Sequence, residues 1–268
     1  MSKNADIPRV LSIAGSDSGG GAGIQADLKA FAYCGAYGMT AVTAITAQNT
    51  EAVVRAEAVT PDLIQAQVRA VMKDIGVDAV KVGMLGSKAT IEAVAGVLAE
   101  LGDAPIVVDP VMVAESGARL LPEDAVEALV ESILPLATVL TPNIPEAAVL
   151  TGLDRNASQV ELAEELLKIG SRTVVVTGGH SVGLVDVFAE PGLTEEITGP
   201  SHPDGASHGS GCTHSSALAA GLARGMSPLE AARFAREVAS LAVQKGLVTI
   251  GKGAGPVDLT GLLDRLDP

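Results

Sequence analysis

A cysteine, Cys212, stands where a loop of small residues (208–215) enters a helical stretch. Such a loop presents several unpaired backbone N–H groups at the positive end of the helix dipole, which suits a phosphate or a developing negative charge. The same position predicts a lowered pKa for Cys212, so that its thiolate could accept a proton from a substrate hydroxyl. The alternative is a small apolar cysteine packed at a helix end. A zinc site of His208, Cys212 and His214 is disfavoured because the spacing fits no standard zinc pattern.

A second loop of small residues, 15–23, holds five glycines in nine positions and follows the first apolar run. Without a Cβ, glycine lets backbone amides approach a ligand closely. The segment matches neither the dinucleotide-binding glycine pattern nor a Walker loop, which would end in Gly-Lys-Ser/Thr. An ordinary flexible turn is the alternative. A third glycine-rich segment, 251–256, precedes no apolar periodicity, and we expect only a closing turn beside a nucleotide site.

Polar side chains follow two further apolar runs. Asp109 comes directly after 106–108, and a buried acid there is unfavourable unless it is paired or metal-bound. Asn143 and Glu146 follow 139–140 and would share one side of a helix's first turn. A carboxylate and an amide there could hold a hydrated Mg²⁺ against phosphate oxygens. Capping is the alternative, with Asn143 as N-cap and Glu146 at the third helical position.

Gln48 ends a threonine- and valine-rich run, and its carboxamide places a donor beside an acceptor. That pair matches the edge of an aminopyrimidine, where an amino group adjoins a ring nitrogen. Met84 could supply an apolar wall to the same pocket. With two tyrosines, three phenylalanines and no tryptophan in the chain, aromatic stacking of a base is not an expected device.

The elements that must position these residues alternate along the chain. Repeated strand–helix–strand units predict a mostly parallel sheet with helices on both faces. Ligands of such sheets bind beyond the carboxyl ends of the strands, where the residues above stand. We expect one domain over 1–268, with an antiparallel edge hairpin at 182–188 and 193–197. The other expected strands are 10–14, 39–47, 80–82, 106–108, 139–140 and 174–176, and the expected helices are 24–34, 62–75, 88–101, 123–133, 159–168, 211–224 and 228–245.

Composition excludes several classes of protein. The 268 residues include 18 basic and 32 acidic ones, and the net charge of −14 repels nucleic acid and anionic membranes as main partners. The apolar runs are shorter than the ~20 residues of a membrane span, and 1–8 is not a signal peptide. Two cysteines make no disulfide framework, which is typical of a reducing cytoplasm. The hypothesis of a stand-alone metal or redox protein is disfavoured, because only those two cysteines and four histidines support it.

Seven segments, taken together in chain order, form a specific pattern. They are Ala14-Gly15-Ser16-Asp17 continuing to Gly23-Ile24-Gln25-Ala26-Asp27, Gly35-Ala36-Tyr37-Gly38, Ala47-Gln48-Asn49-Thr50, Val82-Gly83-Met84-Leu85, Asp109-Pro110-Val111-Met112, Thr141-Pro142-Asn143-Ile144-Pro145-Glu146-Ala147 and His208-Gly209-Ser210-Gly211-Cys212-Thr213. The pattern resembles the hydroxymethylpyrimidine kinase/phosphomethylpyrimidine kinase family of thiamine biosynthesis. The resemblance implies a ribokinase-like fold, and MgATP-dependent phosphorylation of 4-amino-5-hydroxymethyl-2-methylpyrimidine and then of its monophosphate.

The same resemblance implies a role for each candidate residue. Gln48 would bind the amino edge of the pyrimidine, in a pocket completed by Gly15, Ala22, Asp27, Met84 and Val111. The anion hole would consist of Gly209, Ser210, Gly211 and Cys212, with Cys212 where related sugar kinases have a catalytic aspartate. The nucleotide and its Mg²⁺ would be placed by Asp109, Asn143, Glu146, Thr177 and Gly179, with Asp109 and Glu146 nearest the metal. The family also implies a homodimer.

Thr177 departs from the family pattern. Many members have a lysine there that reaches ATP phosphates, and its replacement resembles the branch that includes pyridoxal-phosphorylating relatives. Gln48 points the other way, because those relatives tend to lose the glutamine. The alternatives are therefore a pyridoxal or pyridoxine kinase, and a non-catalytic pyrimidine-binding module.

Overall fold

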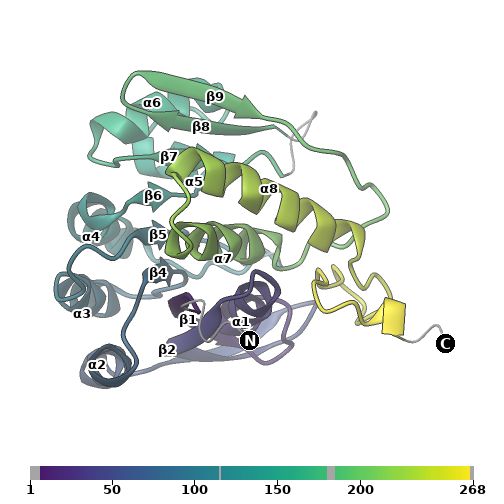
Figure 1. Ribbon diagram of the computed structural model, residues 1–268, viewed down its shortest axis with the longest axis horizontal. Helices are drawn as coiled ribbons and strands as arrows, with labels where there is room; N and C mark the ends of the chain where they lie inside the picture. Colours follow the sequence, from purple (N-terminus) through teal and green to yellow (C-terminus); the bar gives the residue numbers. More distant parts are fainter. Residues whose placement is uncertain (1–6, 115, 180–184, 266–268) are drawn as a thin grey trace, which may run out of the picture.

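The apolar runs of the sequence form the middle strands of one sheet. The computed structural model describes residues 7–114, 116–179 and 185–265. Within them, nine strands pair in the order β3-β2-β1-β4-β5-β6-β7-β8-β9 (Figure 1). The parallel part, from β2 to β7, confirms the predicted α/β class; its strands are β2 (Tyr37–Gln48), β1 (Arg9–Asp17), β4 (Ala79–Val82), β5 (Ile106–Val108), β6 (Val139–Leu140) and β7 (Val174–Val176).

Antiparallel strands lie at both edges of the sheet. The predicted hairpin is present as β8 (Asp186–Glu190) and β9 (Leu193–Ile197), and residues 182–184 of its expected first strand lie outside the described residues. At the other edge, β3 (Val53–Ala58) pairs antiparallel with β2 and was not expected. Most of its residues are exposed, so it lacks the apolar alternation that marks a half-buried strand.

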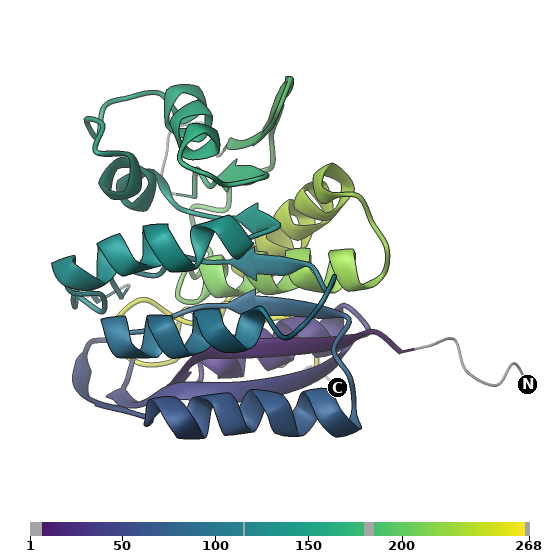
Figure 2. The same ribbon diagram turned by 90° about the vertical axis from the view of Figure 1, so that its left-hand side faces the viewer.

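Helices cover both faces of the sheet. One face packs against α2 (Pro61–Asp74), α3 (Lys88–Leu98), α4 (Glu123–Ser132), α5 (Ile144–Thr151) and α6 (Gln159–Lys168). The other face packs against α1 (Gly23–Tyr33), α7 (Ser210–Ala223) and α8 (Pro228–Gln244). Figure 2 shows α2, α3 and α4 stacked on the layer that faces the viewer. Single 3₁₀ turns occur at Leu134–Leu136 and Leu263–Arg265, and no helix among the described residues has the length and apolar character needed to cross a bilayer.

The alternation of side chains along the strands brings polar residues together at one end of the sheet. In β4, Val80 and Val82 pack under the α2–α6 layer, whereas Ala79 packs on the α7 side. Side chains two residues apart share a face, so Lys81 follows Ala79 toward α7. Asp109 stands in the same relation to Val107 of β5. The carboxyl end of the sheet beneath α7 is therefore polar.

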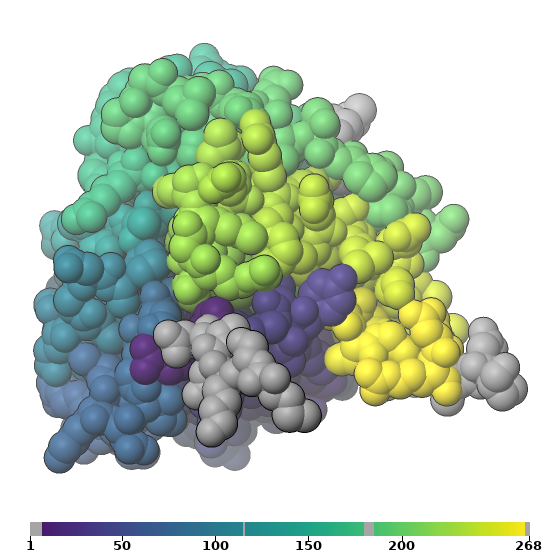
Figure 3. All heavy atoms as spheres, viewed as in Figure 1, coloured from purple at the N-terminus to yellow at the C-terminus, as the bar shows by residue number. Residues whose placement is uncertain are grey.

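The first strand is longer than its apolar run predicts. It was expected to end at residue 14, but Ser16 and Asp17 continue the pairing with β2 beyond a register shift. The first three positions of the segment taken as a loop, 15–17, are thus strand. Figure 3 shows the C-terminal segment beside α8, and residue 256 pairs there with residue 208.

Candidate active site

Asp17 organises the first glycine-rich loop. Its Oδ1 accepts a hydrogen bond from the Gly19 N–H at 2.8 Å, and its Oδ2 accepts from the N–H groups of Gly21 and Ala22 at 3.0 and 2.9 Å. The Nε2 of His208, in the second loop, lies 3.3 Å from the same Oδ2. Burial alone would raise the pKa of Asp17, but the contacts with His208 and the loop amides lower it overall. The loop is therefore a fixed structure and not the flexible turn of the alternative interpretation.

The second loop rests directly on the first. Gly209 precedes α7 with φ +86°, a conformation that favours glycine, and a Cβ there would overlap the carbonyl oxygen of Gly21. The Gly23 backbone N–H forms a hydrogen bond with the Cys212 side chain. The predicted anion-hole residues Gly209, Ser210, Gly211 and Cys212 therefore form the start of α7, against the glycine-rich loop.

Cys212 does not have the lowered pKa expected of a helix N-terminus. Its side chain is half-buried, and burial raises its pKa to about 12, while Lys81 opposes this rise and the nearby Asp109 and Asp27 add to it. The helix dipole is outweighed by loss of water and by two carboxylates. The free thiol therefore keeps its proton at neutral pH.

Two buried carboxylates follow β5 and β6. The Oδ2 of Asp109 accepts a hydrogen bond from the Ser215 hydroxyl at 2.9 Å and lies 3.8 Å from the Lys81 ammonium. Burial raises the pKa of Asp109, and Lys81 counters part of that rise. Burial and then the charge of Asp109 raise the pKa of Glu146 to about 8. The charge of Asp109 thus makes Glu146 harder to ionise.

The capping interpretation of Asn143 and Glu146 is confirmed. The Asn143 side chain accepts from the Glu146 N–H at 2.9 Å, and a Glu146 carboxylate oxygen accepts from the Asn143 N–H at 3.0 Å, which completes a capping box. The other Glu146 oxygen accepts from the Met112 N–H at 3.4 Å. No group of three or more histidine, cysteine or acidic side chains able to hold a metal occurs among the described residues. A cation at Asp109 and Glu146 would therefore take most of its ligands from phosphate oxygens and water.

Several residues of the predicted pyrimidine pocket are brought together. A Cβ on Gly15 would lie 2.5 Å from the Met84 side chain, so these two positions adjoin. The Ser18 hydroxyl donates to the Gln48 carbonyl at 2.7 Å and accepts from the Gln48 N–H at 2.9 Å, which joins β2 to the glycine-rich loop. Ala22, in that loop, is held by Asp17. Gly15 thus adjoins Met84, and Gln48 adjoins the loop that contains Ala22, while a pocket shared by all four stays a prediction.

Asp27 lies beneath this region and not on its surface. Its carboxylate is fully buried and accepts hydrogen bonds from the hydroxyls of Ser12 and Ser216, at 2.6 and 2.8 Å. The Lys81 ammonium lies 3.0 and 3.2 Å from its two oxygens. Contact between Asp27 and a substrate stays a prediction. Lys81 itself was missed, although a lysine between two valines of a buried strand is a readable signal of a buried charge.

The remaining residues of the predicted nucleotide site lie on the side of Asp109 away from Gln48 and Met84. Thr177 bridges with Asn143, and its N–H donates to the Pro142 carbonyl at 2.8 Å. Gly179, two positions on, is exposed. Val111, which was predicted for the pyrimidine pocket, is half-exposed beyond the end of β5. Gln48 and Met84 thus stand at the ends of β2 and β4, Asn143 and Thr177 at the ends of β6 and β7, and Asp109 at the end of β5 between them in the sheet.

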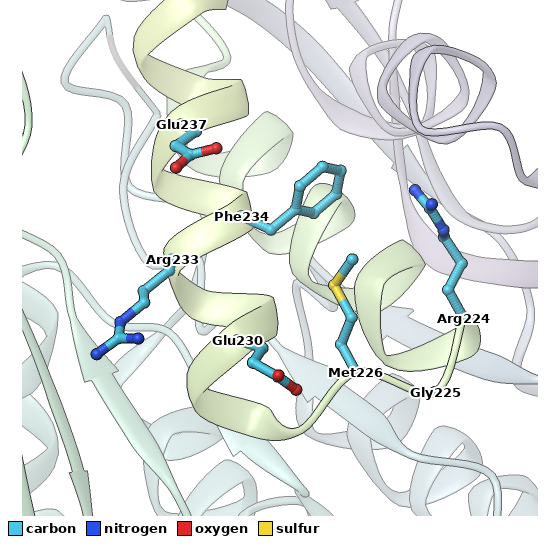
Figure 4. A pocket seen from close by; sticks show the side chains of 7 residues that line it. All are labelled: Arg224, Gly225, Met226, Glu230, Arg233, Phe234 and Glu237. Atoms are coloured by element: carbon cyan, nitrogen blue, oxygen red, sulfur yellow. The ribbon is translucent and has the colours of Figure 1, made fainter.

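A surface depression of about 440 Å³ lies elsewhere, between the end of α7 and the start of α8 (Figure 4). The 14 residues of α7 span about 20 Å, so this depression is at the end of the helix opposite Cys212. It is lined by Arg224, Gly225, Met226, Glu230, Arg233, Phe234 and Glu237. None of the residues predicted to act in catalysis borders it.

Comparison with known proteins gives a consistent family. The family model for phosphomethylpyrimidine kinase matches residues 17–258. A hydroxymethylpyrimidine/phosphomethylpyrimidine kinase of Rhizobium meliloti (strain 1021) is 46% identical over 253 residues, which cover 92% of this chain and 95% of the relative. Two solved structures share the ribokinase-like fold. The pyridoxal kinase of Bacillus subtilis, in an ADP complex, has a TM-score of 0.88 at 36% identity and covers 96% of this chain and 99% of its own.

The second structure is a phosphomethylpyrimidine kinase of Clostridium difficile 630, with a TM-score of 0.75 at 40% identity over 85% of this chain and 96% of its own. Sequence similarity is thus higher to the pyrimidine kinases, while the backbone also matches a pyridoxal kinase well. The match of the family model over most of the chain settles the assignment. The chain belongs to the phosphomethylpyrimidine kinase family.

Proposed function

We propose that the protein transfers the γ-phosphoryl group of ATP to 4-amino-5-hydroxymethyl-2-methylpyrimidine, and then a second phosphoryl group to the monophosphate, in thiamine biosynthesis. The observation that carries this proposal is the seating of the α7 start, with Cys212, on the glycine-rich loop that adjoins Gln48. It supports the proposal because a helix terminus suited to an anion lies against the loop that bonds to the Gln48 backbone. The similarity to named kinases of both steps supports the same conclusion.

Each residue has a proposed role that follows from its position in the site. Gln48 orients the pyrimidine ring, and Gly15, Ala22, Met84 and Val111 form the walls around it, with Asp27 beneath. The backbone amides of 209–212 stabilise the charge that spreads over the transferring phosphoryl oxygens. Cys212 accepts the hydroxyl proton as a thiolate, after its pKa has fallen in the complex and its own proton has left to solvent. Because the transition state of phosphoryl transfer is loose, positioning and charge stabilisation matter more than a strong base.

Asp109 and Glu146 fit a divalent cation. Both carboxylates are buried, and the charge of Asp109 raises the pKa of Glu146, which a divalent cation would offset; hard oxygen ligands are those that Mg²⁺ prefers. When bound, Mg²⁺ would neutralise charge on the nucleotide phosphates. Asn143, Thr177 and Gly179 are proposed to contact the nucleotide, with the Thr177 N–H already fixed by the Pro142 carbonyl.

A pyridoxal kinase is the second candidate, favoured by Thr177 in place of the family's lysine and by the fold match to a Bacillus subtilis pyridoxal kinase. An ADP-release assay with MgATP separates the two. Hydroxymethylpyrimidine, its monophosphate and pyridoxal are compared side by side, and we expect turnover of the first two with little on pyridoxal. Turnover on pyridoxal alone would replace the proposal, and tight pyrimidine binding without turnover would indicate a binding module.

We also propose one functional domain over 1–268, a homodimer and a cytoplasmic location. The single sheet that joins the described strands supports the first, family resemblance the second, and the two free cysteines, Cys34 and Cys212, the third. Gel filtration with light scattering tests the dimer. A mass near twice 26.9 kDa is the expected result, and a mass near 26.9 kDa would contradict it.

A further inference from the structure

Lys81 is a buried cation at the centre of the site. Its side chain is fully buried in β4, on the face that packs under α7. Burial opposes its charge, but the nearby carboxylates and Cys212 raise the pKa of Lys81 above its ordinary value. Lys81 therefore carries a positive charge inside the protein, close to the predicted reaction centre.

The ammonium joins two carboxylates that belong to different parts of the site. It lies 3.0 Å from Asp27, under the pyrimidine pocket, and 3.8 Å from Asp109, on the phosphoryl side. Both carboxylates also accept a hydrogen bond from the first two turns of α7: Asp27 from Ser216 at 2.8 Å and Asp109 from Ser215 at 2.9 Å. One ammonium and two adjacent serines thus connect the sheet, α1 and α7 immediately beyond Cys212.

A purely structural ion pair would explain less of this geometry. A buried lysine needs one hydrogen-bonded carboxylate to offset its desolvation, and Asp27 is that partner. The second carboxylate, Asp109, stands where a nucleotide and its cation are expected. The local sequence also leaves room for the ammonium, because a Cβ on Gly83 would lie 2.8 Å from the Lys81 Nζ.

We propose that Lys81 is a positioning residue for phosphoryl transfer, which holds Asp109 and the start of α7 in register with the pyrimidine pocket and supplies the positive charge beneath Cys212. The proposal rests on the proposed kinase function. Lys81 acts through Asp109 and the α7 turn without touching substrate. Its loss should therefore reduce kcat and leave the KM for the pyrimidine nearly unchanged.

The first test is Lys81→Met, which keeps the length of the side chain and removes its charge. We expect kcat to fall at least 100-fold, with the pyrimidine KM within threefold of wild type. Ser12→Ala is the matched control, because it removes one hydrogen bond from the same Asp27 and leaves the ammonium, Asp109 and both α7 serines in place; its kcat should stay within threefold. Equal losses in the two variants would overturn the proposal, since they would show a role in packing alone.

The second test does not depend on the identity of the substrate. In a Cys34→Ala background, the rate at which iodoacetamide alkylates Cys212 is measured at pH 8.5 for wild type and Lys81→Met. Loss of the cation should slow alkylation at least threefold. A merely structural Lys81 would instead loosen the α7 start and speed alkylation, which would overturn the proposal even if the pyrimidine proves not to be the substrate.

Gly83→Ala covers the case in which Lys81→Met does not fold. The added methyl group displaces the ammonium and removes no charge, so we expect a folded protein with kcat lowered about tenfold and an unchanged pyrimidine KM. Wild-type kcat in folded Gly83→Ala would contradict the proposal. Wild-type protein that turns over no pyrimidine, with alkylation slowed in Lys81→Met, would reject the proposed function and keep the role of Lys81.

Discussion

Replacing Glu146 by glutamine tests the electrostatics of the site through protein stability. In the folded protein the pKa of Glu146 is raised to about 8, from an ordinary value of 4.5. The folded carboxyl binds its proton more tightly than the unfolded one, so raising the pH from 4.5 through 8 favours the unfolded chain. The gap corresponds to about 5 kcal/mol at about 1.4 kcal/mol per pKa unit. Above pH 8, the free energy of unfolding of the wild-type protein should be lower by this amount than it is below pH 4.5.

Glutamine cannot ionise, so Glu146→Gln avoids the loss. It keeps one acceptor oxygen where the carboxylate offered two, which costs about 1 kcal/mol because the Asn143 or the Met112 N–H loses its partner. We therefore expect the variant to match wild type near pH 5 and to be about 4 kcal/mol more stable at pH 8.5. Urea unfolding followed by circular dichroism in EDTA measures both values. A difference that stays constant with pH would refute the reasoning.

Glu161→Gln is the matched control, because Glu161 occupies the same capping-box position in α6 but is exposed. Hydrogen bonds from the Ser158 backbone and side chain lower the pKa of Glu161. Its contribution to stability is therefore present above the ordinary pKa and is lost as the pH falls. Glu161→Gln should be less stable than wild type at neutral pH and approach it toward pH 4, opposite in sign to Glu146→Gln.

Three further substitutions test the residues of the site. Cys212→Ala should lower kcat about 100-fold or more with little change in KM, as expected for loss of a proton acceptor, and full turnover in the ADP-release assay would remove it from that role. Gln48→Met should lower kcat/KM for hydroxymethylpyrimidine about tenfold or more and shift preference toward pyridoxal, measured as the ratio of the two values. Gly209→Ala should lower both melting temperature and kcat, because the left-handed backbone and the Gly21 carbonyl exclude a side chain; a variant with wild-type values would contradict the seating of the two loops.

The sequence predicts the middle of the fold well for a physical reason. Strands such as Val174–Val176 are buried on both faces, so their apolar runs stand out between amphipathic helices. The edge strand Val53–Ala58 has no such signal, because its backbone pairs with β2 while its side chains remain mostly exposed. Its arginine and glutamate, Arg55 and Glu57, form an exposed ion pair. These charged residues give the segment a composition typical of a loop.

The candidate site is predicted in its residue types but not in its charge states. Chain order alone places Gly15 and Gln48 near the ends of their strands and Cys212 at the start of a helix, and the fold then brings these segments together. The pKa of Cys212 depends instead on burial and on Asp27 and Asp109, which lie far from it in the sequence. No pattern among neighbouring residues of the sequence indicates how close these carboxylates come to Cys212 in the folded chain. The helix N-terminus was a correct indication of position and a wrong indication of protonation.

The raised pKa values of Asp109, Glu146 and Cys212 have one shared origin. Each group is desolvated, Asp109 acts on both of the others, and Lys81 is the ammonium within reach of Asp109 and Asp27. A site with three such groups around one ammonium resists further negative charge. The nucleotide phosphates of a phosphoryl transfer bring further negative charge to the site. We expect the compensating positive charge from the amides at the start of α7 and from a cation that arrives with the nucleotide. In the proposed reaction, the deficit of positive charge that keeps the Cys212 thiol protonated in the free protein would make its deprotonation depend on a complete set of ligands, which would link proton transfer to correct assembly of the complex.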